Sequence, residues 1–297
     1  MCRPPDRPLR STNAVLSPDR GAEPTTETPA PTYGPKDARV IVTGGGTGIG
    51  RATALELARA GARVAVLGRT RESLENVVEE IRHRGAESRA CVADIRDEES
   101  VNRAFADVEA AWGGVDVLVN NAGGQFPKLA VDMSVNGWRS VVDLNLNGTF
   151  ICSQAFARAA IARGAGGTIV NVTTAAALRP SKGLAHSTSA RYGVIAMTRA
   201  LALEWAEHGI TVNAVAPGMI NTSGLVDAEL GGETSLISRL ANDAVPLRRA
   251  GTPEEVATLI AFVASPACAY MTGETILLDG GYVLGPGMHI DAAGTYE

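Results

Sequence analysis

Cysteine, lysine and long apolar runs are all scarce in this 297-residue chain. The four cysteines (Cys2, Cys91, Cys152 and Cys268) lie far apart and show no metal-ligand or disulfide spacing. We therefore predict no metal site and expect the chain in a reducing compartment, the cytoplasm. No apolar run approaches the roughly 20 residues that a transmembrane helix needs, so the sequence predicts no membrane-spanning segment.

An excess of positive charge is also missing. Lysine and arginine together number 27 against 32 acidic residues, which leaves a formal net charge of −5. This balance excludes the basic surface that is typical of nucleic-acid binding or of attachment to anionic membranes. We therefore expect a small-molecule substrate, with neither nucleic acid nor membrane as a partner.

The amino-terminal segment lacks the apolar stripe of a helix. Residues 1–36 hold eight prolines among many serines, threonines and mixed charges, which predicts a disordered tail without a signal peptide. Apolar residues make up 45% of the chain, enough for one large core. We predict a single domain over residues 37–285 and a short tail over 286–297.

Short β-branched runs alternate with amphipathic segments throughout the domain. The runs typical of strands lie at 39–43, 63–67, 88–93, 115–120, 167–173, 210–215 and 275–278. The segments typical of helices lie at 50–60, 71–84, 98–112, 137–163, 186–208 and 253–264. This alternation predicts a doubly wound, Rossmann-type α/β domain with a mostly parallel, seven-stranded sheet and helices on both faces. Ligands of such sheets bind beyond the carboxyl ends of the strands.

A glycine-rich loop lies between the first strand and the first helix. It reads Thr-Gly-Gly-Gly-Thr-Gly-Ile-Gly over residues 43–50. Glycines let the backbone turn tightly and approach a pyrophosphate, which the helix N-terminus stabilises. The loop therefore predicts a dinucleotide site that includes Gly44, Thr47, Gly48, Ile49 and Gly50.

The end of the second strand indicates which dinucleotide is bound. A site that prefers NAD places an acidic residue there, whereas this chain has Gly68 followed by Arg69, with Arg51 just after the glycine loop. A guanidinium favours a 2′-phosphate through charge-assisted hydrogen bonds. We therefore expect NADPH as the cofactor, although both arginines could instead be solvated surface residues.

Three further strand ends carry residues suited to a dinucleotide. Asp94 could accept a hydrogen bond from the adenine amino group, and small residues after the fourth strand would admit the ribose closely. The expected cofactor residues at these ends are Asp94, Ile95, Asn121, Ala122, Gly123, Pro217, Gly218, Ile220 and Thr222. The segment from the sixth strand to the last helix, near 220–246, has mixed polarity and predicts a substrate lid.

Together these motifs resemble the short-chain dehydrogenase/reductase family. The resemblance covers about residues 38–283. It includes Thr-Gly-x3-Gly-x-Gly, Asn-Asn-Ala-Gly, Leu-Asn-Leu-Asn-Gly, Val-Asn-Ala-Val-Ala-Pro-Gly and a late Leu-Asp-Gly-Gly. It implies a single domain that transfers a hydride between nicotinamide and substrate. It also implies a homotetramer or homodimer, and gives Asn145 the family's structural and water-relay role.

The catalytic pair of that family is absent. Most members carry a Tyr four residues before a Lys, but none of the three lysines here (Lys36, Lys128 and Lys182) follows a Tyr at that spacing. Alignment on Gly193-Val194 puts Ser187 at the Tyr position and Arg191 at the Lys position, where Arg191 is also an expected cofactor residue that would hold the ribose hydroxyls. Tyr192 is turned about 100° around the helix from Arg191, so we expect it to be a packing residue.

Other motifs resemble the enoyl-CoA and dienoyl-CoA reductase branch of the family. These are Leu-Ala-His-Ser-x-x-Ala-Arg over residues 184–191, Gly-Gly-Gln-Phe-Pro over 123–127 and Leu-Glu-Trp over 203–205. Members of the branch reduce a conjugated C=C bond, and dienoyl reductases hold a Tyr after the fifth strand where this chain has Ala176. The resemblance therefore favours an NADPH-dependent reductase of an enoyl thioester or a related unsaturated carbonyl.

The expected catalytic residues are Asn145, Thr173, Ser187 and Arg191. Hydride addition would leave an enolate on the thioester oxygen, which needs hydrogen-bond donors but no strongly acidic Tyr. The expected substrate residues are Gln125, Phe126 and His186. Structural interpretations remain open: Ser187 could cap its helix, Thr173 and Thr174 could simply end a strand, and His186 could be an ordinary buried or exposed histidine.

Two other functions remain open at this point. One is a carbonyl reductase, of 3-oxoacyl groups or ketones, that uses Ser, Thr and an ordered water. The other is a cofactor-binding member of the family that performs no hydride transfer or has a specialised-pathway role.

Overall fold

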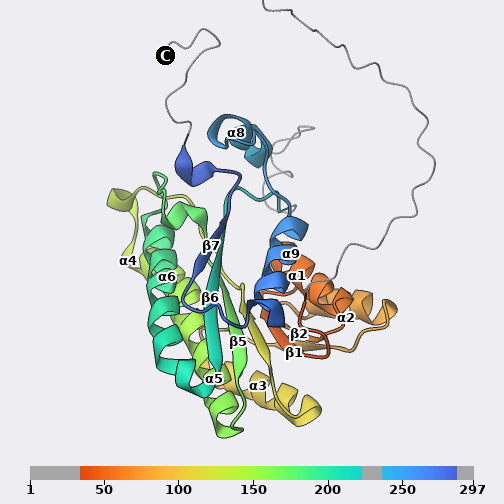
Figure 1. The fold of residues 1–297 in the computed structure, drawn as a ribbon. Coiled ribbons are helices and arrows are strands. Elements are labelled where there is room, and N and C mark those ends of the chain that lie inside the picture. Colours follow the sequence, from red (N-terminus) through yellow and green to blue (C-terminus); the bar gives the residue numbers. More distant parts are fainter. Residues whose placement is uncertain (1–33, 223–235, 286–297) are drawn as a thin grey trace, which may run out of the picture. The chain divides into compact units, whose positions relative to one another are not determined.

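The computed structural model describes residues 34–222 and 236–285 as strands alternating with helices along the chain (Figure 1). The strands are β1 (Arg39–Thr43), β2 (Arg63–Gly68), β3 (Ser88–Val92), β4 (Val117–Asn120), β5 (Gly167–Val172), β6 (Ile210–Pro217) and β7 (Thr275–Leu278). The main helices are α1 (Gly48–Arg59), α2 (Arg71–His83), α3 (Glu98–Trp112), α4 (Val135–Val142), α5 (Gly148–Ala162), α6 (Ala185–Trp205), α8 (Leu236–Ala244) and α9 (Pro253–Val263). The predicted alternation is confirmed.

The seven strands form one sheet in the order β3-β2-β1-β4-β5-β6-β7. Every neighbouring pair is parallel, so the sheet is wholly rather than mostly parallel. The chain winds outward in one direction from β1 to β3 and in the other from β4 to β7. Such a reversal opens a crevice at the carboxyl ends of the two central strands, β1 and β4.

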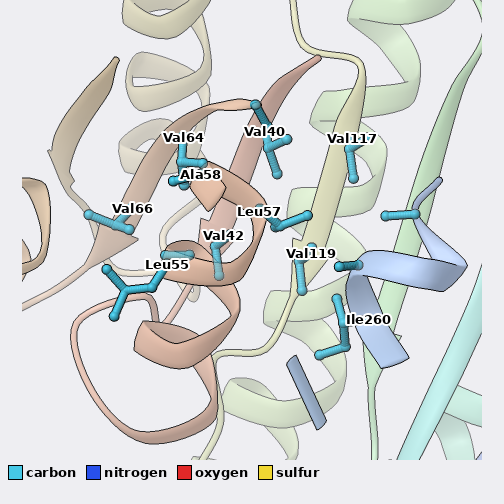
Figure 2. Close-up of a cluster of buried hydrophobic side chains, with 14 of the residues drawn as sticks. Val40, Val42, Leu55, Leu57, Ala58, Val64, Val66, Val117, Val119 and Ile260 are labelled. Carbon is cyan, nitrogen blue, oxygen red and sulfur yellow. The ribbon is translucent and has the colours of Figure 1, made fainter. Parts of the chain in front are cut away.

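Alternate residues of each strand enter different cores. Val40 and Val42 of β1 pack in one core with Leu57 of α1 and Ile260 of α9 (Figure 2). Ile41 points to the opposite face, where α3, α5 and α6 cover the sheet. Figure 1 shows α1, α2 and α9 on one side of the sheet and α5 and α6 on the other. Burial on both faces explains the continuous apolar strands.

Polar side chains tie the central strands to the helices on one face. The amide nitrogen of Asn120 in β4 donates to Ser153 Oγ in α5 and to Asn171 Oδ1 in β5, each at 2.9 Å. Asn171 in turn donates to Thr198 Oγ1 in α6 at 2.9 Å. Because buried hydrogen bonds are directional, they fix α5 and α6 relative to the strand ends where ligands bind.

The helix predicted over 137–163 is interrupted. It is α4, a π-helical turn over Asp143–Asn147, and then α5. Asn145 Nδ2 donates to Val141 O at 2.8 Å, and Thr149 Oγ1 donates to Asn145 O at 2.9 Å. Side chains thus compete for backbone acceptors here, which is a recognised cause of an irregular helical turn. Sequence periodicity could not reveal it, because the apolar spacing continues.

Several predictions fall on other parts of the chain. The predicted tails, over 1–36 and 286–297, lie almost wholly outside the described residues, as does the middle of the predicted lid, residues 223–235. Within the described parts of the chain, no helix has both the length and the apolar character needed to cross a bilayer.

Candidate active site

The glycine-rich loop turns tightly from β1 into α1. Gly44 and Gly48 have φ angles of +64° and +51°, a conformation that side chains rarely adopt. A Cβ added at Gly50 would lie 2.1 Å from Gly44 O, so the loop has no room for a larger residue there. The glycines therefore serve a compact turn that presents backbone N–H groups at the start of α1.

Asn121 supports this loop from the end of β4. Its Nδ2 donates to Thr43 O at 3.0 Å and to Gly44 O at 3.2 Å. The Thr43 hydroxyl accepts from the backbone N–H groups of Asn121 and Ala122, both at 3.0 Å. The Asn121 side chain thus holds two loops together, a role that the sequence motif alone did not indicate.

A cavity of about 380 Å³ lies over the crevice between β1 and β4. Loops after β1, β2, β3 and β4 line most of it, and Thr222 after β6 completes the lining, as expected for a ligand site of a doubly wound sheet. The predicted cofactor residues that line it are Gly44, Thr47, Gly48, Ile49, Gly50, Arg69, Asp94, Ile95, Asn121, Ala122, Gly123 and Thr222. Sequence reasoning left out Gly46, Gly68, Thr70, Ser73, Leu74, Ala93 and Leu144. The position of Thr70 between β2 and α2, and of Ser73 in the first turn of α2, could have indicated them.

Pro217, Gly218, Ile220 and Arg191, which were also expected to bind the cofactor, are not among the residues that line this cavity. Gly218 instead packs on the chain after β7: its N–H donates to Leu278 O at 3.0 Å, and an added Cβ would lie 2.7 Å from Asp279 Cα. Ile220 borders a separate, smaller cavity of about 190 Å³. The end of β6 borders the main cavity only through Thr222.

The two arginines expected near a 2′-phosphate differ in their surroundings. Arg51 pairs with Glu80 at 2.5 Å, so its guanidinium is already engaged. Arg69 is exposed at the rim of the cavity, and no ion pair engages it within the described residues. The expectation for a 2′-phosphate therefore depends on Arg69.

Asp94 also has a partner at the cavity. Its carboxylate accepts from the Arg96 guanidinium, with a shortest contact of 2.5 Å. The Arg96 hydrogen bond lowers the pKa of Asp94 from its ordinary value. The carboxylate is therefore charged at neutral pH and keeps lone pairs for a further donor such as an amino group.

The predicted catalytic residues approach the other end of the crevice. Asn145, Thr173 and Ser187 are all buried. Arg191 donates to the carbonyl of Val172, the residue before Thr173, at 2.6 Å. A Cβ added at Gly123 would lie 1.9 Å from Arg191 Nη2 and 2.6 Å from Asn145 Oδ1. Gly123, which also lines the cavity, thus connects the expected cofactor residues to the expected catalytic ones.

Arg191 is a partly buried cation. Removal of the guanidinium from water lowers its pKa to about 10. Within the described residues, no carboxylate forms an ion pair with it. An unneutralised cation beside the crevice favours a ligand that offers lone pairs or negative charge.

Ser187 lies one turn before Arg191 on α6. Its hydroxyl donates to Gln125 Oε1 at 2.5 Å across the gap to the loop after β4. The helix begins at Ala185 with Leu184 as its N-cap, so the interpretation of Ser187 as a cap is wrong. Tyr192 is 53% exposed, so within the chain it packs only in part.

The neighbouring pair, His186 and Phe126, makes a ring contact. The ring centroids lie 4.9 Å apart in an edge-to-face arrangement. His186 is fully buried, and neither ring nitrogen has a hydrogen-bond partner among the described residues. The sequence could not tell a buried histidine from an exposed one here.

Two threonines end β5 in different environments. The Thr173 hydroxyl accepts from the Thr174 N–H, which leaves its own proton free to donate. The Thr174 hydroxyl accepts from Ala176 N–H at 3.2 Å and so caps the short helical turn Ala175–Ala177. Thr174 is therefore structural, and Thr173 retains a donor for a ligand.

Comparison with known proteins finds extended similarity. A family model described as "Enoyl-(Acyl carrier protein) reductase" matches residues 44–283. A probable 2,4-dienoyl-CoA reductase of Bacillus subtilis (strain 168) is 39% identical over 83% of this chain and 97% of its own. A 3-oxoacyl-[acyl-carrier-protein] reductase of Synechocystis is 39% identical over 82% of this chain and 96% of its own. A short chain dehydrogenase of Bacillus anthracis has a TM-score of 0.75 at 38% identity, over 83% and 96% of the two chains.

Proposed function

Since the chain belongs to the short-chain dehydrogenase/reductase family of oxidoreductases, we propose that it is an NADPH-dependent reductase of enoyl thioesters or related unsaturated carbonyls. One observation supports the proposal: Ser187 is buried and Arg191 donates to Val172 O one helical turn away, and the sequence alignment puts these two residues at the positions of the family's Tyr and Lys. Neither side chain is a strong acid at neutral pH. Such a pair suits a reaction that needs hydrogen-bond donors at an oxygen more than it needs a phenol.

The residues around the crevice fit a nicotinamide dinucleotide. Gly46 and Gly48 line the cavity, and a Cβ at Gly46 would lie 2.7 Å from Ser73 Oγ, so side chains would fill the cradle. The start of α1 would hold the pyrophosphate, and Arg69 would hold the 2′-phosphate. When bound, the cofactor would supply the hydride, and the residues that line the cavity would hold the cofactor in position.

In this proposal Arg191 binds the cofactor ribose, and Ser187 and Thr173 bind the substrate oxygen. Arg191 would donate to the ribose hydroxyls, because its second amino group faces Gly123 at the cavity wall. Ser187 and Thr173 would donate to the thioester oxygen as negative charge develops there, which lowers the barrier by electrostatic stabilisation. Phe126 and His186 would lie along the acyl group, and Asn145 would hold the loop between them.

Protonation of the α-carbon completes the reaction. The enolate carbon is basic enough to take a proton from water or from a modest acid, so no phenol is required. Dienoyl reductases have a Tyr in the loop after the fifth strand. This chain has Ala176 at that position, and an alanine side chain cannot donate a proton. This favours the enoyl over the dienoyl substrate, even though a probable dienoyl-CoA reductase is among the similar proteins.

A carbonyl reductase is the second candidate. The similar 3-oxoacyl-[acyl-carrier-protein] reductases of Synechocystis and Aquifex aeolicus favour it. In that reaction the alkoxide itself must take a proton, so Ser187 would have to relay one from water. The buried hydroxyl pair makes this slower than with a Tyr, but does not forbid it.

NADPH oxidation by the purified chain tests the proposal. A trans-2-enoyl-CoA series and a matched 3-oxoacyl-CoA series would be compared with NADPH and with NADH. Turnover of the enoyl series with NADPH is expected, and turnover of the oxo series alone would favour the second candidate. Tight NADPH binding without turnover of either series would contradict both, and would favour a member of the family that transfers no hydride to these substrates.

We further propose that the chain acts in the cytoplasm as a homotetramer or homodimer. Large apolar side chains stay exposed around α4 and α5, including Val131, Val135, Trp138 and Phe150. A second copy of the chain would cover them. Light scattering after size exclusion measures the assembly, and a monomer at micromolar concentration would contradict this part.

A further inference from the structure

We propose that Gln125 is a positioning residue for the reaction, and that its side-chain amide sets the direction of the Ser187 O–H bond. The inference rests on the proposed function, in which Ser187 donates a hydrogen bond to the thioester oxygen. Its physical basis is a single contact between two elements, the 2.5 Å hydrogen bond from Ser187 Oγ to Gln125 Oε1.

The hydroxyl of Ser187 is directed differently from those of other buried helix residues. Ser153 and Thr198 donate to the backbone carbonyl four residues earlier on their own helices, at 2.7 and 2.8 Å. Ser187 lies in the first turn of α6, and the carbonyl four residues earlier, that of Gly183, accepts from Lys128 N–H instead. Ser187 therefore points away from its helix and bonds across to Gln125.

The loop that carries Gln125 is held in place by other contacts. Asn145 clamps Gly124, since its Nδ2 donates to Gly124 O at 2.8 Å and its Oδ1 accepts from Gly124 N–H at 3.2 Å. Phe126 packs on His186, and Lys128 N–H donates to Gly183 O at 2.9 Å. The loop does not need the Gln125 side chain to stay in place, which leaves that side chain free for a role at Ser187.

The chemistry of an amide suits this role. With Oε1 toward Ser187, Gln125 accepts a hydrogen bond from the Ser187 hydroxyl. Ser187 can then only accept a hydrogen bond from a ligand and cannot donate one to it. When the amide turns over, Nε2 donates to Ser187 Oγ, and the Ser187 proton becomes free to point at an oxygen with developing negative charge. Ser187 stays neutral throughout, and no proton is transferred between the two side chains. One amide thus serves both hydrogen-bond directions, which a carboxylate cannot do.

The burial of Ser187 makes the direction of its hydrogen bond important. Ser187 is 3% exposed, so water cannot easily replace whichever partner is lost. Gln125 itself is exposed, so its replacement leaves no cavity in the core. A change in turnover after substitution of Gln125 would therefore report the direction of the Ser187 hydroxyl more than a change in packing.

Two variants of Gln125 and one control test the inference. Gln125→Met keeps the length of the side chain but removes both hydrogen-bond directions, and should lower kcat about tenfold with an unchanged KM for NADPH. Gln125→Glu should be slow at pH 8, because the carboxylate accepts the hydrogen bond of the Ser187 hydroxyl, and should recover part of its turnover as the pH falls toward about 5, where a carboxyl with an ordinary pKa of about 4.3 begins to gain a proton. Lys128→Met, in the same loop, should keep the kcat and the pH profile of the unmodified chain.

The pH profile is the readout that a merely structural role would not move. If Gln125→Glu and Gln125→Met both keep the wild-type kcat and pH profile, the positioning role is overturned while the proposed function stands. If the unmodified chain reduces neither substrate series, the proposed function has failed instead.

A measurement without substrate tests the hydrogen bond on which the inference depends. The thermal unfolding midpoints of Gln125→Met, Ser187→Ala and the double variant form a cycle. A bonded pair predicts that the double variant unfolds close to the midpoint of Ser187→Ala. Fully additive losses would mean that the two side chains are not coupled, and would overturn the inference.

Discussion

Arg191 joins the two ends of the site through a single side chain. One of its amino groups donates to Val172 O at 2.6 Å, and the other faces Gly123 at the wall of the dinucleotide cavity. The guanidinium has no ion-pair partner among the described residues, and burial lowers its pKa to about 10. It therefore keeps its charge at neutral pH, with donors left over for a ligand.

The replacement of Arg191 tests whether these donors hold the cofactor. Arg191→Ala should raise the KM for NADPH by about tenfold or more, since hydrogen bonds from a charged group contribute roughly 1.5–3 kcal/mol. Arg191→Lys should recover part of this, because it restores the charge but not the bond to Val172 O. Steady-state kinetics with varied NADPH measures both variants. Unchanged cofactor kinetics in Arg191→Ala would remove this role.

Residue identities could be predicted from the sequence more readily than residue roles. Ser187 and Arg191 were indicated by their spacing and are brought to one region. That Asn121 holds the glycine loop and that Arg51 pairs with Glu80 could not be predicted, because both depend on contacts between elements far apart in the chain. Side-chain partners are set by the packed structure, which local patterns do not encode.

At the scale of elements, the turn from β1 into α1 has no room for a side chain at Gly50. A Cβ at Gly50 would lie 2.1 Å from Gly44 O and 2.5 Å from Asn121 Nδ2, and neither neighbour is free to move. Gly50→Ala should therefore displace the loop and abolish measurable NADPH binding while the far end of the sheet stays folded. Fluorescence titration measures the binding. The control is Gly85→Ala, far from the loop: its φ of +83° strains the backbone, but its Cβ would meet nothing within 4 Å. Equal binding by both variants would contradict the argument.

The start of α9 predicts a dependence of stability on pH. Thr252 and Glu255 form a capping box, and the Arg249 hydrogen bond, followed by that of Thr252 N–H, lowers the pKa of Glu255 from 4.5 to about 2. A carboxyl whose pKa is depressed by folding stabilises the fold above its unfolded pKa. That contribution is lost as the pH falls from about 4.5 toward 2.

Glu255→Gln should keep the capping-box acceptor but lose the charge that pairs with Arg249 near the start of α9, and should therefore lower the free energy of unfolding by about 0.3–1 kcal/mol at pH 7. The difference from the unmodified chain should shrink as the pH falls from 5 toward 2. Urea unfolding at several pH values measures it, with Glu254→Gln as the control, since Glu254 shares the first turn of α9 but not the box. A pH-independent difference would show that the charge of Glu255 is not involved.

At the scale of the whole molecule, the strand order follows from rules that the sequence already contained. Alternating strands and helices require parallel pairing with right-handed crossovers, and this limits the sheet to few arrangements. The π-helical turn around Asn145 escaped prediction because a side-chain hydrogen bond causes it. The position of the cavity, by contrast, follows from topology, since it lies where the chain reverses between β1 and β4.

That position makes the cofactor a stabiliser of the whole sheet. The cavity is lined by loops after β1, β2, β3 and β4, so a dinucleotide bound there would link four strands that meet only in the native state. NADPH at about 100 times its Kd should add about 2.7 kcal/mol to the free energy of unfolding. For a domain of this size, that corresponds to a rise in Tm of roughly 5–10 °C.

A preference for NADPH over NADH would depend on a group that binds the 2′-phosphate. Arg69 is the candidate, and its neighbour Arg71 is a matched control. Arg69 borders the cavity without an ion pair among the described residues, whereas Arg71 pairs with Glu75 at 3.3 Å and does not line that cavity. Arg69→Ala should therefore erase most of the Tm advantage of NADPH over NADH at equal concentration, and Arg71→Ala should keep it. If both variants keep that advantage, the 2′-phosphate is held by other groups, such as the Thr70 and Ser73 hydroxyls at the same rim.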